Sequence, residues 1–163
     1  MIETCIIRPV TQDDLDSLFN MLVDLIHHEG LLDRFKMTRL RLEEELFGKN
    51  ADWQALVASC NNTLAGFCLY SLANTNRAFN STPMIQIDDL YVHPDYRQMR
   101  LGQKLIRTLA QIAKNKGIER INVFCMKDNL QGQNFYQKLG AEKLDFMDVY
   151  KILVPDLLSQ LKE

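Results

Sequence analysis

The side chains best suited to chemistry follow the apolar run 84–92, where a block of basic residues begins. From Tyr96 to Gly117 there is no Asp or Glu, and six cations are present: Arg97, Arg100, Lys104, Arg107, Lys114 and Lys116. A strand that leads into a helix presents free backbone N–H groups and the positive end of the helix dipole, which together bind anions. Gly102 would let this backbone approach a ligand closely. These residues indicate a phosphate site, although a solvated basic helix after a turn would have the same composition.

Length and composition bound what the chain can be. Its 163 residues, 47% of them hydrophobic, suffice for the core of one domain over residues 1–163. The net charge of −2 excludes a general polyanion-binding surface, so no nucleic-acid partner is expected. No apolar run is long enough for a membrane helix and no leader pattern opens the sequence, so no membrane partner is expected. Four cysteines without a Cys-x-x-Cys pair argue against a zinc site and favour reduced thiols in a cytoplasmic protein.

Hydrophobic periodicity predicts a mixed α/β fold with the element order β-α-α-β-β-β-α-β-α-β. Asn61 and Asn62 form the expected turn of a hairpin, and 74–83 is expected to be a polar loop. The run 118–126 has the composition of a strand buried on both faces, and Pro155 is expected to open a final helical turn. The expected strands are 4–8, 53–59, 64–72, 84–92, 118–126 and 146–154, and the expected helices are 11–29, 38–47, 101–116 and 130–139.

The segment Arg97-Gln98-Met99-Arg100-Leu101-Gly102 resembles motif A of the GNAT superfamily of N-acetyltransferases. That motif reads Gln/Arg-x-x-Gly-x-Gly/Ala directly after a strand; Gly102 matches its second glycine, and Arg100 replaces the first. The resemblance implies one GNAT-type domain, which contains a central, mostly antiparallel sheet with helices on both faces. It also implies acetyl-CoA as co-substrate and no metal. The residues carried over are Leu90, Tyr91 and Val92 for the pantetheine arm, and Arg97, Gln98, Met99, Arg100, Leu101, Gly102 and Gln103 for the pyrophosphate.

Arg100 has two possible consequences for this cradle. Its side chain could obstruct the tightest part of the loop, or its guanidinium could add a charge-assisted contact to phosphate. We expect acetyl-CoA binding in either case.

The segment 128–141 resembles motif B of the same superfamily, in which an Asn follows a strand and Phe-Tyr-x-x-x-Gly lies on the next helix. Here these residues are Asn129, Phe135, Tyr136 and Gly140. The resemblance implies that Asn129 caps the helix and binds the CoA arm together with Gly132, and that Tyr136 points at the sulfur of acetyl-CoA. A phenol is ordinarily protonated at neutral pH and can donate to a departing thiolate. An isolated Phe-Tyr pair would more often be a pair of core aromatics.

A narrower resemblance concerns the amine. The segment 25–38 and the strand entry at Asp88 and Asp89 are similar to the diamine acetyltransferases, which include spermidine/spermine and thialysine N-acetyltransferases. This implies that Glu29, Asp88 and Asp89 line the amine channel, with His28 beside it. Neighbours on a strand point to opposite faces unless a β-bulge turns both the same way. Asp88 replaces the glutamate that is more usual in this subgroup, and Met147 and Asp128 replace aromatic residues that are frequent there. These three replacements should change the shape of the amine pocket.

The expected activity is therefore direct acetyl transfer to a small di- or polyamine or a thialysine-like amine. Tyr136 is the expected general acid, Glu29 and Asp89 are the expected catalytic carboxylates, and the Val92 amide polarises the thioester carbonyl. Acetylation of a protein lysine or N-terminal amine is the alternative within the enzyme class. A non-catalytic acyl-CoA-binding module is the alternative outside it. Relatives of this kind are usually homodimers, so a homodimer is expected.

Overall fold

The computed structural model describes residues 4–74, 78 and 82–161. Most of the polar loop expected at 74–83 lies outside the described residues. The chain forms two compact units, residues 1–124 and 125–163. No helix in the described part of the chain has both the length and the apolar composition needed to cross a membrane.

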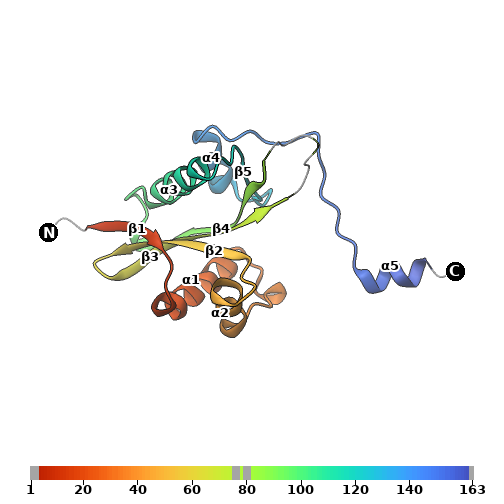
Figure 1. Ribbon diagram of the computed structural model, residues 1–163, viewed down its shortest axis with the longest axis horizontal. Coiled ribbons are helices and arrows are strands. Elements are labelled where there is room, and N and C mark those ends of the chain that lie inside the picture. The colour runs from red at the N-terminus through yellow and green to blue at the C-terminus, as the bar shows by residue number, and fades with distance from the viewer. Residues whose placement is uncertain (1–3, 75–77, 79–81, 162–163) are drawn as a thin grey trace. The chain divides into compact units, whose positions relative to one another are not determined.

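The first unit is built on one five-stranded sheet with the strand order β1-β2-β3-β4-β5 (Figure 1). Neighbours are antiparallel from β1 to β4, while β5 runs parallel to β4. The mostly antiparallel sheet predicted from the sequence is thus confirmed. The strands are β1 (Cys5–Pro9), β2 (Trp53–Cys60), β3 (Thr63–Ala73), β4 (Met84–Val92) and β5 (Ile121–Val123).

The turn between β2 and β3 forms as expected. Cys60 and Thr63 are register partners, so Asn61 and Asn62 alone make the connection. Their φ angles of 49° and 64° are the positive values that a type I′ hairpin turn requires and that Asn tolerates.

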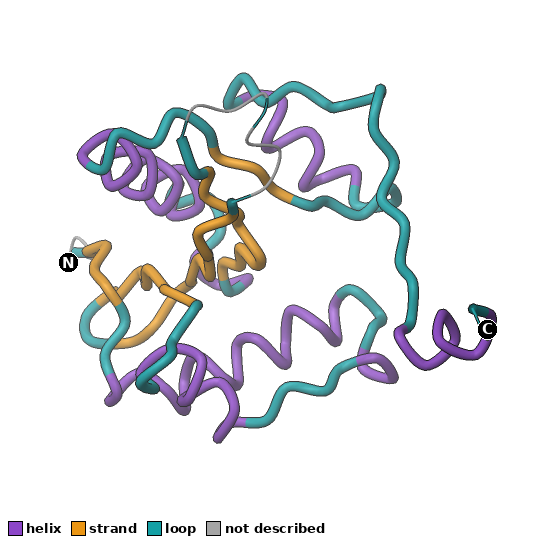
Figure 2. The backbone as a smooth tube through the Cα atoms, turned by 45° about the vertical axis from the view of Figure 1, so that its right-hand side comes forward, coloured by secondary structure: helices purple, strands orange, loops and turns teal. Residues whose placement is uncertain are grey.

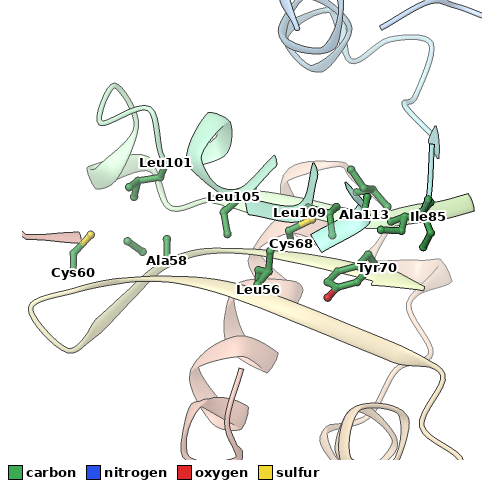
Figure 3. Close-up of a cluster of buried hydrophobic side chains, with 13 residues drawn as sticks. Leu56, Ala58, Cys60, Cys68, Tyr70, Ile85, Leu101, Leu105, Leu109 and Ala113 are labelled. Atoms are coloured by element: carbon green, nitrogen blue, oxygen red, sulfur yellow. The ribbon is translucent and has the colours of Figure 1, made fainter. Parts of the chain in front are cut away.

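Helices cover both faces of this sheet, and each face has its own core (Figure 1). Leucines of α1 (Leu15–His28) and α2 (Arg39–Phe47) pack with Val57, Phe67, Leu69 and Tyr91 on one face. On the other face, Leu101, Leu105 and Leu109 of α3 (Leu101–Asn115) lie against Leu56, Cys68 and Ile85, as Figure 3 shows. Short 3-10 turns, η1 (Gln12–Asp14), η2 (Leu32–Arg34) and η3 (Pro94–Tyr96), connect these elements.

The second unit contains α4 (Leu130–Lys138) and α5 (Val154–Gln160), and α5 opens with Pro155 in its first turn as expected. The strand predicted at 146–154 does not form, and Figure 2 draws the segment between α4 and α5 as loop. Phe146 and Tyr150 are 79% and 84% exposed. A strand needs a hydrogen-bonded neighbour, and among the described residues of this unit there is none.

The strand predicted at 118–126 is also shorter than expected. Only Ile121–Val123 pair with β4, and all three side chains are half-buried rather than buried on both faces. β5 is the last strand of the described sheet, so it lacks the second neighbour that a central strand has.

Two of the four cysteines are not reduced, contrary to the expectation from the sequence. Cys5 and Cys60 are register partners on β1 and β2, and they form a disulfide with Cα atoms 4.1 Å apart. Cys68 and Cys125 take no part in a disulfide. Because 55 residues separate the pair in sequence, only the strand register brings them together.

The disulfide should contribute strongly to stability. Closing a loop across a sequence separation of 55 residues gives about 4 kcal/mol in the chain-entropy description. For a chain of this length, loss of the bond should lower Tm by ~8–16 °C. The measurement is Tm with and without dithiothreitol, with the double variant Cys5→Ala/Cys60→Ala as a control that should not respond. Alkylation of both thiols in the untreated folded protein would show that the bond does not form.

Candidate active site

A β-bulge in β4 determines where the two adjacent aspartates point. Leu69 of β3 pairs with Asp89, but the next residue, Tyr70, pairs with Ile87, so Asp88 has no partner in the ladder. Before the bulge, Ile87 packs in the core beneath α3; after it, Tyr91 packs in the core beneath α1 and α2. In a regular strand residues 87 and 91 would share a face, so the bulge moves the residues after it to the other face. The sequence left open whether such a bulge exists, and the register shift establishes it.

Asp88 and Asp89 both face the side of the sheet covered by α1. The Ser71 hydroxyl donates to Oδ2 of Asp88 at 3.1 Å; from the alternation along β3, Ser71 shares a face with Leu69 and Phe67, which pack beneath α1 and α2. Asp89 pairs with Leu69 on the same face. Glu29, the residue that caps the C-terminal end of α1, is close enough for its charge to affect Asp89.

These carboxylates have unusual acid–base properties because they are withdrawn from water. Burial raises the pKa of Asp89 to about 6, and the charges of Asp88 and Glu29 add to the effect. Burial also raises the pKa of Asp88, which the Ser71 hydrogen bond opposes. The pKa of the nearby Cys68 thiol rises to about 12 through burial and the Asp89 and Asp88 charges, so this thiol is a poor nucleophile. A carboxylate with a pKa near neutrality suits a proton acceptor.

The histidines that precede Glu29 do not share this environment. His28, like His27, is exposed in the last turn of α1. The place of His28 beside an amine remains a prediction. Gly30 ends the helix with a φ of 69°.

The end of β4 presents backbone groups on the side away from β3. The β4–β5 pairing stops at Ile87 and Val123, so from Asp88 to Val92 the described chain supplies a strand partner only on the β3 side. The His93 N–H donates to Ala65 O at 2.9 Å. Because N–H directions alternate along a strand, the Val92 N–H points away from β3. Leu90 and Val92 therefore offer main-chain groups to a ligand, and Tyr91 pairs with Phe67.

Gly66, a residue that sequence reasoning did not single out, makes this part of β4 possible. A Cβ at this position would lie 2.7 Å from Tyr91 O and 3.2 Å from the Val92 Cα. Only glycine therefore lets β3 lie so close to β4 at Val92. A glycine inside a strand pattern often marks such a close approach, which is the signal that could have found it.

The loop 97–103 has free N–H groups at the N-terminus of α3. The Arg97 N–H donates to Pro94 O at 3.2 Å, the Met99 N–H to Tyr96 O at 3.4 Å, and the Lys104 N–H to Arg100 O at 3.0 Å. In the described chain no backbone carbonyl accepts from Leu101, Gly102 or Gln103. Gln98 and Arg100 have φ angles of 72° and 57°, and the Arg97 Nε donates to Val92 O at 3.2 Å. The loop thus combines orphan donors with exposed cations, as an anion site requires.

Arg100 occupies a left-handed conformation that favours glycine. We expect Arg100→Gly to raise the free energy of unfolding by about 1 kcal/mol, because a non-glycine residue in this region costs about 1–2 kcal/mol. The same change should weaken acetyl-CoA binding a few-fold through loss of an exposed guanidinium. Arg100→Ala is the matched control, since it removes the charge and keeps the strained backbone. Thermal unfolding and acetyl-CoA titration check both effects, and tighter binding by the glycine variant would show that the side chain obstructs the cradle.

In the second unit, Asn129 caps α4. Its Oδ1 accepts from the Gly132 N–H at 2.8 Å, and a Cβ on residue 132 would lie 2.8 Å from the Asn129 Nδ2. Gly132 therefore leaves room for the capping side chain. The Gln133 Nε2 donates to Met126 O at 3.1 Å and Lys127 O at 2.8 Å, which fixes the loop before the helix.

Tyr136 lies on α4, half-buried. Its ring makes an edge contact with Phe135, with centroids 5.2 Å apart. The helix ends after this pair, and Gly140 has a φ of 86°. The phenol and Asn129 are thus held on one short, capped helix.

Residues 19–141 match the sequence model of a family described as Acetyltransferase (GNAT) family. Thialysine N-epsilon-acetyltransferase of Sus scrofa is 26% identical over 147 residues, which cover 85% of each chain. Spermidine N(1)-acetyltransferase of Thermoplasma acidophilum is 26% identical over 151 residues, covering 85% of this chain and 89% of that one. Among solved structures, aminoglycoside N-acetyltransferase AAC(6')-Iy in complex with CoA has a TM-score of 0.74 at 17% identity, covering 93% and 97% of the two chains. The matched range includes Glu29, β4, the loop 97–103 and Tyr136.

Proposed function

Because the chain belongs to the GNAT family of acetyltransferases and is an N-acetyltransferase, we propose that it moves the acetyl group of acetyl-CoA to a primary amine of a small di- or polyamine or a thialysine-like molecule. The observation that carries this proposal is the bulge at Asp88, which turns Asp88 and Asp89 to one face of the sheet. Carboxylates gathered near one another attract a cationic amine. The family resemblance predicted from motifs A and B is confirmed by the family match.

Acetyl-CoA supplies the thioester whose carbonyl carbon the amine attacks. The first-turn N–H groups of α3, together with Arg97 and Arg100, would bind its pyrophosphate. The main-chain groups of Leu90 and Val92 would pair with the pantetheine arm, and the Val92 N–H would polarise the thioester carbonyl. Asn129 and Gly132 would contact the same cofactor from α4.

Three proton transfers complete the reaction. An alkylammonium must lose a proton before it can attack, and Asp89, with its pKa of about 6, is suited to accept it. Glu29 and Asp88 supply further negative charge for the cation. Tyr136 would donate a proton to the departing thiolate, and the proton that the amide nitrogen loses would restore the phenol. The acetyl group thus passes directly from the cofactor to the amine without a covalent enzyme intermediate.

We further propose that residues 1–163 act as one acetyltransferase domain and that the protein is a homodimer. The second unit exposes large apolar side chains that a second copy would cover. These exposed side chains are Phe146, Met147, Val149, Tyr150, Ile152, Leu153, Val154, Leu157, Leu158 and Leu161. Burying apolar surface contributes roughly 25 cal/mol per Å² to association. A cytoplasmic location stays a prediction. It can be tested through Cys5 and Cys60, because a disulfide between them would persist in an oxidising compartment and would be rare in the cytosol.

The test is thiol release from acetyl-CoA, measured against a blank without amine. The panel contains spermidine, spermine, putrescine, thialysine, free lysine and a lysine peptide. Saturable turnover with a small amine is the expected result. Turnover with the peptide alone would assign the protein to the lysine acetyltransferases, and acetyl-CoA binding without any turnover would indicate a binding module.

A further inference from the structure

Ser71 on β3 contacts the bulge from the neighbouring strand. Its hydroxyl donates to the Asp88 Oδ2 at 3.1 Å. Ser71 pairs with Trp53 on its β2 side and with Gln86 on its β4 side. The contact with Asp88 therefore reaches diagonally along the strand pair to the residue that the bulge leaves out of the ladder.

A bulged residue needs such a contact more than its neighbours do. Strand pairing fixes the backbone of Asp89 through Leu69, but it does not fix that of Asp88. A side-chain hydrogen bond is then the local interaction that selects one direction for the Asp88 carboxylate. The two aspartates thus differ, because Asp88 accepts a hydroxyl hydrogen bond while Asp89 lies near the negative charges of Asp88 and Glu29.

We propose that Ser71 is a positioning residue: its hydroxyl orients Asp88 as the fixed negative charge that binds the ammonium group of the substrate, and thereby leaves Asp89 as the proton acceptor. This inference rests on the proposed function, since it needs a cationic amine at these carboxylates. The two adjacent acids then perform different tasks in one reaction.

The electrostatic surroundings fit this division. Burial raises the pKa of Asp88, and the Ser71 hydrogen bond opposes this rise because it favours the ionised carboxylate. The groups that act on Asp89 are Asp88 beside it on β4 and Glu29 at the end of α1, and Cys68 on β3 feels both aspartates. An ionised Asp88 helps to keep the pKa of Asp89 at about 6. Loss of the hydroxyl should therefore perturb both groups.

Steady-state kinetics of Ser71→Ala tests the proposal. We expect KM for the amine to rise ~10–150-fold, which corresponds to losing a hydrogen bond to a charged group. Above the acid limb of the pH profile, where Asp89 is ionised in both proteins, we expect kcat to change less than about 3-fold. We expect KM for acetyl-CoA to stay the same, because the hydroxyl has no proposed contact with the cofactor. The acid limb of the pH profile of kcat/KM should shift, because a mispositioned Asp88 no longer acts on Asp89 in the same way. Ser71→Thr keeps the hydroxyl and should restore KM, and Thr63→Ala on the exposed start of β3 is the control.

Different outcomes separate this inference from the proposed function. An active wild type whose Ser71→Ala variant keeps its amine KM and pH profile overturns the role of Ser71 and leaves the function intact. A wild type that acetylates no amine overturns both. A double-mutant cycle with Asp88→Asn provides a second test, because Ser71→Ala should have no further effect once Asp88 is neutral. Equal effects of Ser71→Ala in both backgrounds would show that Ser71 does not act through Asp88.

Discussion

Asp89→Asn should make the protein more stable and less active at the same pH. We expect the free energy of unfolding at pH 7 to rise by about 1–3 kcal/mol, because a carboxylate whose pKa has moved from 3.8 to about 6 is held in an unfavourable environment when ionised. We expect kcat/KM for the amine to fall by ~10²–10⁴-fold, the usual contribution of a general base. The increase in Tm should be ~2–12 °C for a chain of this length.

The pH dependence gives this prediction a definite sign. The folded protein binds a proton at Asp89 more tightly than the unfolded chain does, so the stability contribution of the protonated form is fully present below the unfolded pKa near 4 and is lost as the pH rises through about 6. The difference in stability between Asp89→Asn and the wild type should therefore be largest above pH 7 and disappear below about pH 4. Activity of the wild type should decline on the acid side of about pH 6, where Asp89 becomes protonated.

Denaturant unfolding at several pH values measures the stability difference directly. The matched control is Asp52→Asn, an exposed aspartate in the loop before β2 that should change neither stability nor turnover. A pH-independent difference between the two proteins would show that the charge of Asp89 is not the cause. Full activity of the Asn variant would remove Asp89 as the proton acceptor.

The fold was predictable wherever a local pattern decides the structure. The bounds of β4 agree with the apolar run Met84–Val92 residue for residue. Helices α1 and α4 end within two residues before the turn residues Gly30 and Gly140. The segment 146–154 has an equally apolar pattern, but a strand forms only with a partner strand. The sequence contains no information about that partner, which is why this prediction was wrong.

The candidate site was predictable in its residue types and less so in its geometry. Motifs A and B identified the loop 97–103 and the Asn129–Tyr136 helix by their spacing. The direction of Asp88 depends on the register between β3 and β4, which distant segments determine together. Ser71 and the Cys5–Cys60 pair were missed for the same reason, since both are defined by contacts between strands. Cross-strand geometry is the information that a single sequence does not provide.

Tyr136→Phe should lower kcat by ~10–1000-fold, because the variant removes the proton donor that we propose for the departing thiolate. The affinity for acetyl-CoA should stay within about 2-fold, since this prediction assigns the phenolic O–H no part in binding. The fold should also persist, because the edge contact between the rings of residues 135 and 136 needs no hydroxyl.

The comparison that isolates the hydroxyl uses a second tyrosine of the same unit. Tyr150 is 84% exposed in the single chain and lies outside motifs A and B, so Tyr150→Phe removes an equivalent hydroxyl and keeps the ring that a second copy would cover. We expect full turnover from that variant and a low kcat from Tyr136→Phe, both with unchanged acetyl-CoA binding in a direct titration. If Tyr136→Phe retains full turnover, another donor or water protonates the thiolate. A loss of acetyl-CoA affinity equal to the loss of kcat would instead assign Tyr136 to cofactor binding, because a group that acts only in the transition state leaves ground-state binding unchanged.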